Sequence, residues 1–216
     1  MTKNQASGRR GSRLDPATVV RAALELLDEK GLDALSLRAV ADRLGVRMNT
    51  VVWHVKTKTR LLELMADAIT GEIALGDLPD PPEERCRELA RRYRLALLGR
   101  RDGAALVAGT YSVESHTLRY AEALVGALLE GGAEERRAAW TAWSIVYLAL
   151  GLVQEEQAAQ AQALDERLSE AISEASYPAL HRVWAYFDAH SFDDRFEYAL
   201  DALLSGRTPA DGAVGE

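Results

Sequence analysis

The stretch SLRAVADRLGVRMNTVVWHVKTK, residues Ser36 to Lys58, decides the fold. Ser36 is a good N-cap, because its hydroxyl can accept a hydrogen bond from an unpaired amide of the first helical turn. The apolar residues that follow recur at i, i+3, i+4 and i+7, the spacing of one helical face: Leu37, Val40, Ala41 and Leu44. Gly45 ends this helix, since glycine adopts the left-handed conformation without a steric penalty.

A second short helix is predicted from about Met48 to His54, after an apolar residue, Val46, that fits between the two helices. Val51 and Val55 would face the core of this unit, and the residues that would face outward are Met48, Asn49, Thr50 and Trp53. Two short helices around a tight turn are typical of a helix-turn-helix, whose second helix enters the DNA major groove. Short helix pairs also occur in proteins that bind no DNA, so the pattern needs support.

Positive charge gathers at this end of the chain. Residues 1–63 hold 12 Lys and Arg against 7 Asp and Glu, a net charge of +5. The remaining residues hold 14 against 26, a net charge of −12, so the whole chain carries −7. An acidic protein can therefore present a basic end to phosphate.

The composition indicates a helical protein. Of the 216 residues 48% are hydrophobic, enough for a sizeable core. Helix-forming Ala, Leu, Glu and Arg dominate and strand patterns are sparse, so we predict an all-α fold. No apolar run reaches the roughly 18–20 residues of a membrane span, and no secretory signal follows Met1. With a single cysteine, Cys86, an intramolecular disulfide is excluded, and we expect a soluble, cytoplasmic protein without a membrane partner.

We predict four segments along the chain: a disordered basic tail, a three-helix domain with the helix-turn-helix, a helical core and a second disordered tail, at residues 1–12, 13–60, 61–205 and 206–216. In the first tail, Arg9 and Arg10 could instead form an arm that touches DNA. The sequence GDLPDPP, residues 76–82, marks the boundary between head and core. Beyond the helix-turn-helix, helices are expected at about residues 16–30, 58–75, 83–99, 103–108, 115–130, 138–153, 177–189 and 192–204.

No catalytic pattern stands out. The four histidines show no metal-ligand spacing such as HExxH, and no phosphate loop or GxSxG motif is present. The adjacent Glu155 and Glu156 are more typical of a solvated helix end than of a catalytic pair. We therefore predict no enzyme activity, no catalytic residue, no metal ligand and no cofactor.

The segment LSLRAVADRLGVRMNTVVWHVKTKTRLLELM resembles the DNA-binding head of the TetR family. The segments LALLGRRDGAALVAGTY and ALGLVQEEQ are similar to the ligand domain of the family's tetracycline-repressor-like members. The resemblance extends from about Ser12 to Ser205. It implies a ligand-responsive transcriptional regulator, a repressor that a small-molecule inducer releases from a palindromic operator in double-stranded DNA.

The resemblance also implies which head residues contact DNA: Arg38, Met48, Asn49, Thr50, Trp53, His54 and Lys58. Asn49 and Thr50 would read bases, and Arg38 could pair with guanine or with phosphate. Lys58 and His54 would contact phosphate. The family's usual Tyr is replaced by Val52, which leaves the operator sequence open.

In the core, the resemblance places a ligand pocket between helices, where bundles usually hold ligands. The position of the family's magnesium-binding His is Val107, and that of a nearby Arg is Tyr111. Thr110 and Glu155 are retained, and the predicted lining comprises Leu89, Tyr93, Val107, Thr110, Tyr111, Tyr120, Leu124, Trp143, Tyr147 and Glu155. This composition favours an apolar or aromatic ligand that needs no metal. The aromatic residues could also be ordinary core.

The segment from Ala138 to Val153 is apolar almost all round, so it should be buried on all sides. We expect a homodimer in which this helix and the helix at residues 192–204 form a four-helix bundle with their copies. Two other functions remain open from the sequence: a sequence-tolerant architectural DNA-binding protein without small-molecule control, and an enzyme or carrier that keeps only the core pocket.

Overall fold

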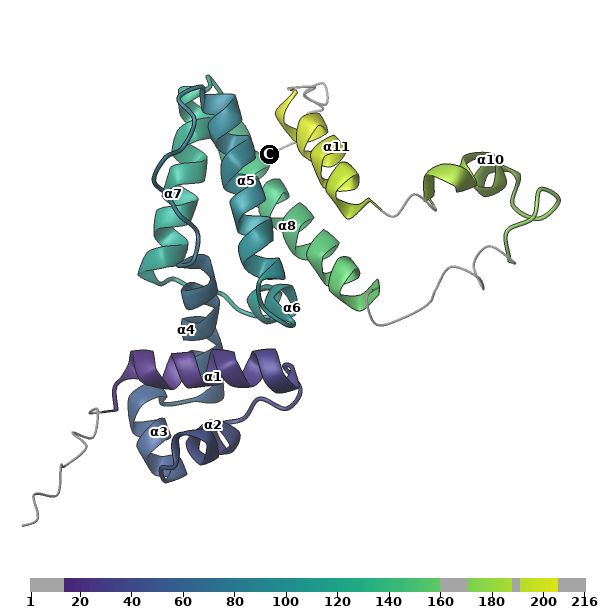
Figure 1. Ribbon diagram of the computed structural model, residues 1–216. Coiled ribbons are helices and arrows are strands. Elements are labelled where there is room, and N and C mark those ends of the chain that lie inside the picture. Colours follow the sequence, from purple (N-terminus) through teal and green to yellow (C-terminus); the bar gives the residue numbers. More distant parts are fainter. Residues whose placement is uncertain (1–13, 160–170, 188–190, 206–216) are drawn as a thin grey trace, which may run out of the picture.

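The computed structural model describes residues 14–159, 171–187 and 191–205, which contain helices and no strand (Figure 1). The predicted all-α fold is therefore confirmed. In chain order the helices are α1 (Pro16–Lys30), α2 (Leu37–Leu44), α3 (Met48–Val55), α4 (Lys58–Thr70), α5 (Pro82–Leu98), α6 (Gly103–Ala108), α7 (Ser115–Glu130), α8 (Glu135–Ala159), α10 (Pro178–Phe187) and α11 (Phe192–Leu204).

Helices α1, α2 and α3 pack against one another as a three-helix head. Helix α1 starts where the sequence predicts, because Asp15 Oδ1 accepts a hydrogen bond of 2.7 Å from the Thr18 amide. Its buried stripe, which includes Val19 and Leu27, forms the centre of the head.

Helix α4 joins the head to the core. It packs against α1 and α3 at one end and against α5, α6 and α7 at the other. Leu61, Met65 and Ile69 are fully buried and lie four residues apart, which places them on one helical face. A displacement of α4 therefore acts on both parts of the molecule.

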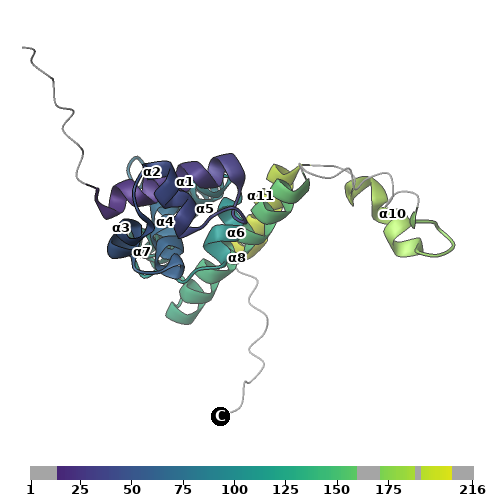
Figure 2. The ribbon, with the colours of Figure 1, turned by 90° about the horizontal axis from the view of Figure 1, so that it is seen from below.

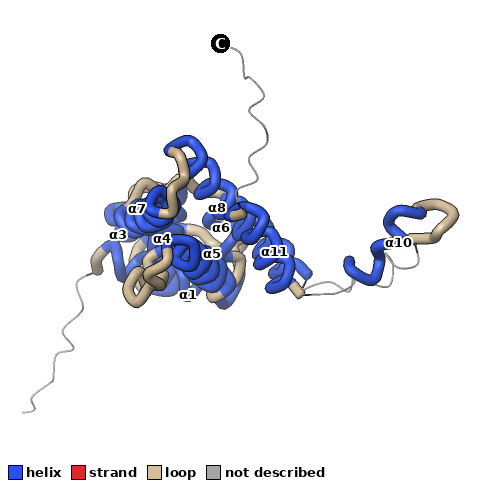
Figure 3. The backbone as a smooth tube through the Cα atoms, turned by 90° about the horizontal axis from the view of Figure 1, so that it is seen from above, coloured by secondary structure: helices blue, strands red, loops and turns tan. Residues whose placement is uncertain are grey.

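Helices α5, α7 and α8 pack against one another and form the body of the core, and the short helix α6 packs against α4, α5 and α8 (Figure 2). Helix α11 packs along α8 (Figure 3). Helix α10 lies apart from the other helices in all three views. None of the helices in the described ranges has the length and apolar character needed to cross a bilayer.

Arginine side chains of α5 hold the loop between α4 and α5. The Arg92 guanidinium donates hydrogen bonds to the carbonyl oxygens of Ala74 at 2.6 Å, Gly76 at 2.8 Å and Asp77 at 3.2 Å. The Arg85 guanidinium donates to those of Pro79 and Asp80. The predicted boundary is thus a fixed corner between α4 and α5.

Several helix bounds differ from the prediction. Helix α4 ends at Thr70 rather than near residue 75, because Gly71 has a low helix propensity and follows as the C-cap. Helix α8 runs from Glu135 to Ala159 and is longer at both ends than the expected helix at residues 138–153. The predicted tails at residues 1–12 and 206–216 lie outside the described residues.

Candidate functional site

The helix-turn-helix is assembled by the capping pattern that its sequence predicts. Ser36 Oγ accepts a hydrogen bond of 3.1 Å from the Ala39 amide. Gly45 has φ 65°, in the left-handed region, and lets the Val46 amide donate to the Ala41 carbonyl at 3.0 Å. Val51 and Val55 of α3 are fully buried, as predicted. These contacts fix the rotation of α3 about its axis.

The opposite face of α3 is exposed. Asn49 and Thr50 are exposed, and Met48 and Trp53 keep 47% and 69% of their surface in solvent. Each predicted DNA-contacting residue of the head is exposed except His54, which is half-buried beside Trp53 with a ring-centroid distance of 4.8 Å. The predicted residues thus lie on the outer side of α2 and α3 and at the start of α4.

Acidic side chains of the head neutralise only part of the positive charge around α3. Arg43 is held by Glu29 through hydrogen bonds of 2.7 and 2.8 Å and by Glu25 at 3.1 Å. In contrast, Arg38, Arg47 and Lys58 form no ion pair with any described residue. Three exposed cations beside α3 are therefore available to phosphate.

Sequence reasoning missed Arg47 and Lys56 in this region. Arg47 is the exposed residue before α3 and supplies no side-chain cap to it. Lys56 has φ 62°, and its ammonium lies 5.6 Å from the centroid of the Trp53 ring while donating to the Trp53 carbonyl at 2.8 Å. This contact orients Trp53. The sequence Trp-His-Val-Lys could have indicated the contact, because it places a cation about one helical turn after an aromatic residue.

A cavity of about 360 Å³ opens between α4, α5, α6, α7 and α8. Eight of the ten predicted pocket residues line it: Tyr93, Val107, Thr110, Tyr111, Tyr120, Leu124, Trp143 and Tyr147. The other two need correction. Leu89 is fully buried but lies behind the lining, where its carbonyl accepts a hydrogen bond from Tyr120. Glu155 is exposed on α8, because the rotation of that helix turns its neighbour Glu156 inward instead.

The cavity carries few free polar groups. The Tyr93 and Tyr120 rings stack with centroids 4.9 Å apart, and burial raises the pKa of both phenols, so both stay protonated. Tyr120 OH donates to the Leu89 carbonyl at 3.4 Å, and Thr110 Oγ1 donates to the Val107 carbonyl at 3.0 Å. Ser112 Oγ is buried in the lining and has no hydrogen-bond partner among the described residues. It is a polar group that a ligand could satisfy, and sequence reasoning missed it.

Metal-ligating side chains do not converge in the described residues: no group of three or more His, Cys, Asp and Glu could hold an ion there. Val107 occupies the position where the resemblance would place an imidazole, and its side chain offers no ligand atom. The side chains that line the cavity offer contact area and hydrogen-bonding groups.

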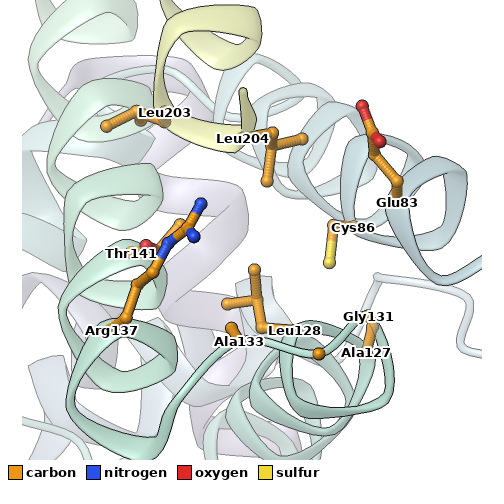
Figure 4. Close-up of a pocket in the computed structure, with 11 residues that line it drawn as sticks. Glu83, Cys86, Ala127, Leu128, Gly131, Ala133, Arg137, Thr141, Leu203 and Leu204 are labelled. Carbon is orange, nitrogen blue, oxygen red and sulfur yellow. The ribbon is translucent and has the colours of Figure 1, made fainter. Parts of the chain in front are cut away.

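A smaller hollow of about 120 Å³ lies at the other end of the core, among α5, α7, α8 and α11 (Figure 4). Cys86 reaches its wall with 1% of its surface exposed, near Leu128 and Leu204. Burial raises the pKa of the Cys86 thiol to about 11, so the group is an unreactive thiol at neutral pH.

Comparisons with known proteins agree with both parts of the structure. Residues 19–65 match the family described as bacterial regulatory proteins, tetR family, and residues 78–208 match the tetracyclin repressor-like C-terminal domain. The tetracycline repressor protein class G of Vibrio anguillarum is 34% identical over 201 residues, which cover 90% of this chain and 94% of that protein.

Solved structures show the same likeness. A possible TetR family transcriptional regulator from Streptomyces coelicolor A3(2) is 37% identical with a TM-score of 0.79, covering 89% of this chain and 98% of that one. A single-residue variant of TetR from Acinetobacter baumannii AYE, solved in complex with minocycline, is 32% identical with a TM-score of 0.70, covering 90% and 96%. The chain therefore belongs to the TetR family of DNA-binding transcriptional regulators and carries a tetracycline-repressor-like C-terminal domain.

Proposed function

We propose that this ligand-responsive regulator is a cytoplasmic homodimeric repressor, which leaves a palindromic operator when a small apolar or aromatic molecule fills the cavity. The observation that carries the proposal is the α3 face, where Asn49 and Thr50 stand exposed on a helix held rigidly by its buried valines. Side-chain amides and hydroxyls at the start of such a helix can read base edges in the major groove.

Phosphate contacts would set the position of α3 in the groove. Arg38, Arg47 and Lys58 are exposed cations without internal ion pairs in the described part of the chain, and they lie on α2, before α3 and at the start of α4. Lys58 also lies at a helix N-terminus, whose amides and dipole favour an anion. These groups support binding to the DNA backbone beside the bases that Asn49 and Thr50 read.

The cavity supports an apolar or aromatic ligand. Its walls are built largely from tyrosine, tryptophan and aliphatic side chains, and Ser112 Oγ, a neutral hydroxyl without a partner among the described residues, is available for a hydrogen bond. Flat aromatic faces such as Trp143 and Tyr147, which stack at 5.4 Å, favour a planar ligand held by area and one or two hydrogen bonds. The relative solved in complex with minocycline supports a small-molecule ligand for the core.

Exposed aromatic residues support the homodimer. Trp140 of α8 and Tyr198 of α11, which lie outside the cavity lining, each keep more than half of their surface in solvent. Monomeric proteins rarely expose apolar patches beyond a few hundred Å². A second copy packed by a twofold axis would cover α8 and α11 with the same surface and would place two α3 helices for two half-sites.

Selection of bound sequences from random duplex DNA tests the proposal. We expect an enriched pseudo-palindrome with half-site centres about 34–36 Å apart or a multiple of that spacing. The selection is then repeated with each compound of a panel of planar aromatic molecules. A compound that acts as the inducer should abolish enrichment of the operator sequence. Tight binding without any enriched sequence would contradict the proposal and favour an architectural DNA-binding protein.

A further inference from the structure

Helix α7 has an unusual N-terminus, because its cap comes from another helix. The residue at its N-cap position, Glu114, makes no side-chain capping bond. The first-turn amides of His116 and Thr117 donate instead to Asp67 Oδ1 of α4, at 3.0 and 2.8 Å. A helix leaves such amides unpaired unless a side chain or water satisfies them. The start of α7 is therefore satisfied by the helix that joins head and core.

The Asp67 carboxylate directs its side-chain hydrogen bonds to α7 as well. Thr117 Oγ1 donates to Oδ1 at 3.0 Å, and His116 Nδ1 lies 2.8 Å from Oδ2. Asp67 is 7% exposed. Burial by itself would raise the pKa of this carboxyl, but the hydrogen bonds from Thr117 and His116 outweigh it and hold the pKa below its usual value. A buried, ionised group thus depends on the position of α7.

This contact lies at the edge of the cavity. Ala66, the neighbour of Asp67, and Thr70 contribute to the lining from α4, and Thr117 and Tyr120 contribute to it from α7. Arg60, nearer the head on α4, adds a second link through its 2.6 Å ion pair with Glu114. Helix α4 itself begins at the exposed Lys58 of the head. The Asp67 cap therefore joins cavity wall and head through one helix.

We propose that Asp67 is the positioning residue that couples the cavity to the DNA-binding head. If a ligand shifts the start of α7, either α4 follows or the two amides and the buried Asp67 carboxylate lose their partners, which costs free energy. By linkage, fixing the head on DNA must then also restrain the start of α7. The inference rests on the proposed DNA binding of the head.

Hydrogen exchange of the full-length protein tests the coupling without a known ligand. The operator is the duplex enriched by the selection described above, and the readout is exchange of the His116 and Thr117 amides with and without that duplex. In the parent, operator should slow exchange at these amides. In Asp67→Ala, exchange should be about tenfold faster in the free protein, as expected for loss of a buried acceptor, and should no longer respond to operator.

Two further variants separate coupling from lost stability. Asp67→Asn keeps an acceptor oxygen and should retain part of the response. Ile69→Val removes a buried methylene from the same helix but no hydrogen-bonding group, so it should keep the full response. Two outcomes would overturn this inference and leave the proposed function standing. In one, the operator response persists in Asp67→Ala; in the other, the parent binds operator but shows no response at these amides. Failure of the parent to bind any selected duplex would overturn the proposed function as well.

Discussion

Asn49 lies at the second position of α3, exposed beside Thr50. A side-chain amide can pair with two atoms of an adenine edge, so Asn49→Ala should lose discrimination at one base position by about 1–3 kcal/mol. Affinity for operators altered at single positions, measured by gel shift, checks this. Lys58→Ala is the control, because loss of a phosphate contact should weaken all sequences alike and reduce the salt slope by about 1. Parent-like selectivity in Asn49→Ala would exclude this residue as a base reader.

Asp67 should make stability depend on acid pH. Its pKa in the folded protein lies below the ordinary value of 3.8, so the folded state holds the charged form more strongly than the unfolded state does. This contribution is complete above the unfolded pKa and is lost as the pH falls through the folded one.

Urea unfolding at several pH values measures this effect. Asp67→Asn should be less stable than the parent at pH 7, and the difference between the two should begin to shrink as the pH falls below about 3.8. Asp33→Asn, which removes an exposed carboxylate from the loop after α1, is the matched control. An equal deficit at pH 7 and at pH 2 would show that the charge of Asp67 contributes nothing.

At the scale of single residues, the sequence predicted what local periodicity controls. The outward and inward faces of α3 follow from one buried valine pair, so Asn49 and Val51 were placed correctly. Which arginine is neutralised could not be predicted, because Arg43 meets partners on a helix 14 and 18 residues away. The Asp67 contact was equally hidden, since it joins residues 49 and 50 positions apart.

At the scale of elements, the cavity predicts ligand binding that is independent of magnesium. Tryptophan fluorescence should respond to a planar aromatic inducer equally with and without EDTA, because Trp143 lines the cavity and Val107 cannot bind a metal. Ala121→Phe narrows the same cavity from an exposed position of α7 and should weaken the response. A strong response to tetracycline that EDTA abolishes would contradict the assigned ligand class.

The sequence was enough to predict where the helices lie, but not which of their side chains face the cavity. Leu89 and Tyr93 lie one turn apart on α5, so the resemblance offered no reason to separate them. The Tyr93–Tyr120 stack, with Tyr120 OH on the Leu89 carbonyl, leaves Leu89 behind the cavity wall. On α8, the neighbour of Glu155 is the one that turns inward, and Glu156 pairs with Arg94 at 2.6 Å. Such choices depend on tertiary packing.

At the scale of the whole molecule, the exposed aromatic surface predicts dimerisation. Trp140 of α8 and Tyr198 of α11 keep 63% and 79% of their surface exposed. A glutamate at either position would stay in solvent in the monomer, but it would place a charge in the twofold interface and oppose dimerisation. The double variant Trp140→Glu, Tyr198→Glu should sediment as a monomer at micromolar concentration and bind operator more weakly, while the parent sediments as a dimer. A monomeric parent would rule out the four-helix interface.

Head and core are also joined outside α4. Arg100 in the turn before α6 pairs with Asp28 of α1 at 2.6 Å, and Asp102 Oδ2 accepts from the Leu32 amide at 2.8 Å. Asp102 has φ 54°, an uncommon backbone conformation for a residue other than glycine. Two separate sets of contacts therefore link the head to the core, and no local pattern in the sequence indicates the second set.

Cys86 gives the molecule a built-in reporter of its own opening. It is the single cysteine of the chain, it is 1% exposed, and its pKa of about 11 leaves few thiolates at neutral pH. A thiol reagent can reach it once α5 separates from α7, α8 and α11. The rate of alkylation therefore measures how often the core opens around Cys86. Slower labelling in the presence of operator or inducer would show that binding elsewhere in the molecule makes this opening rarer.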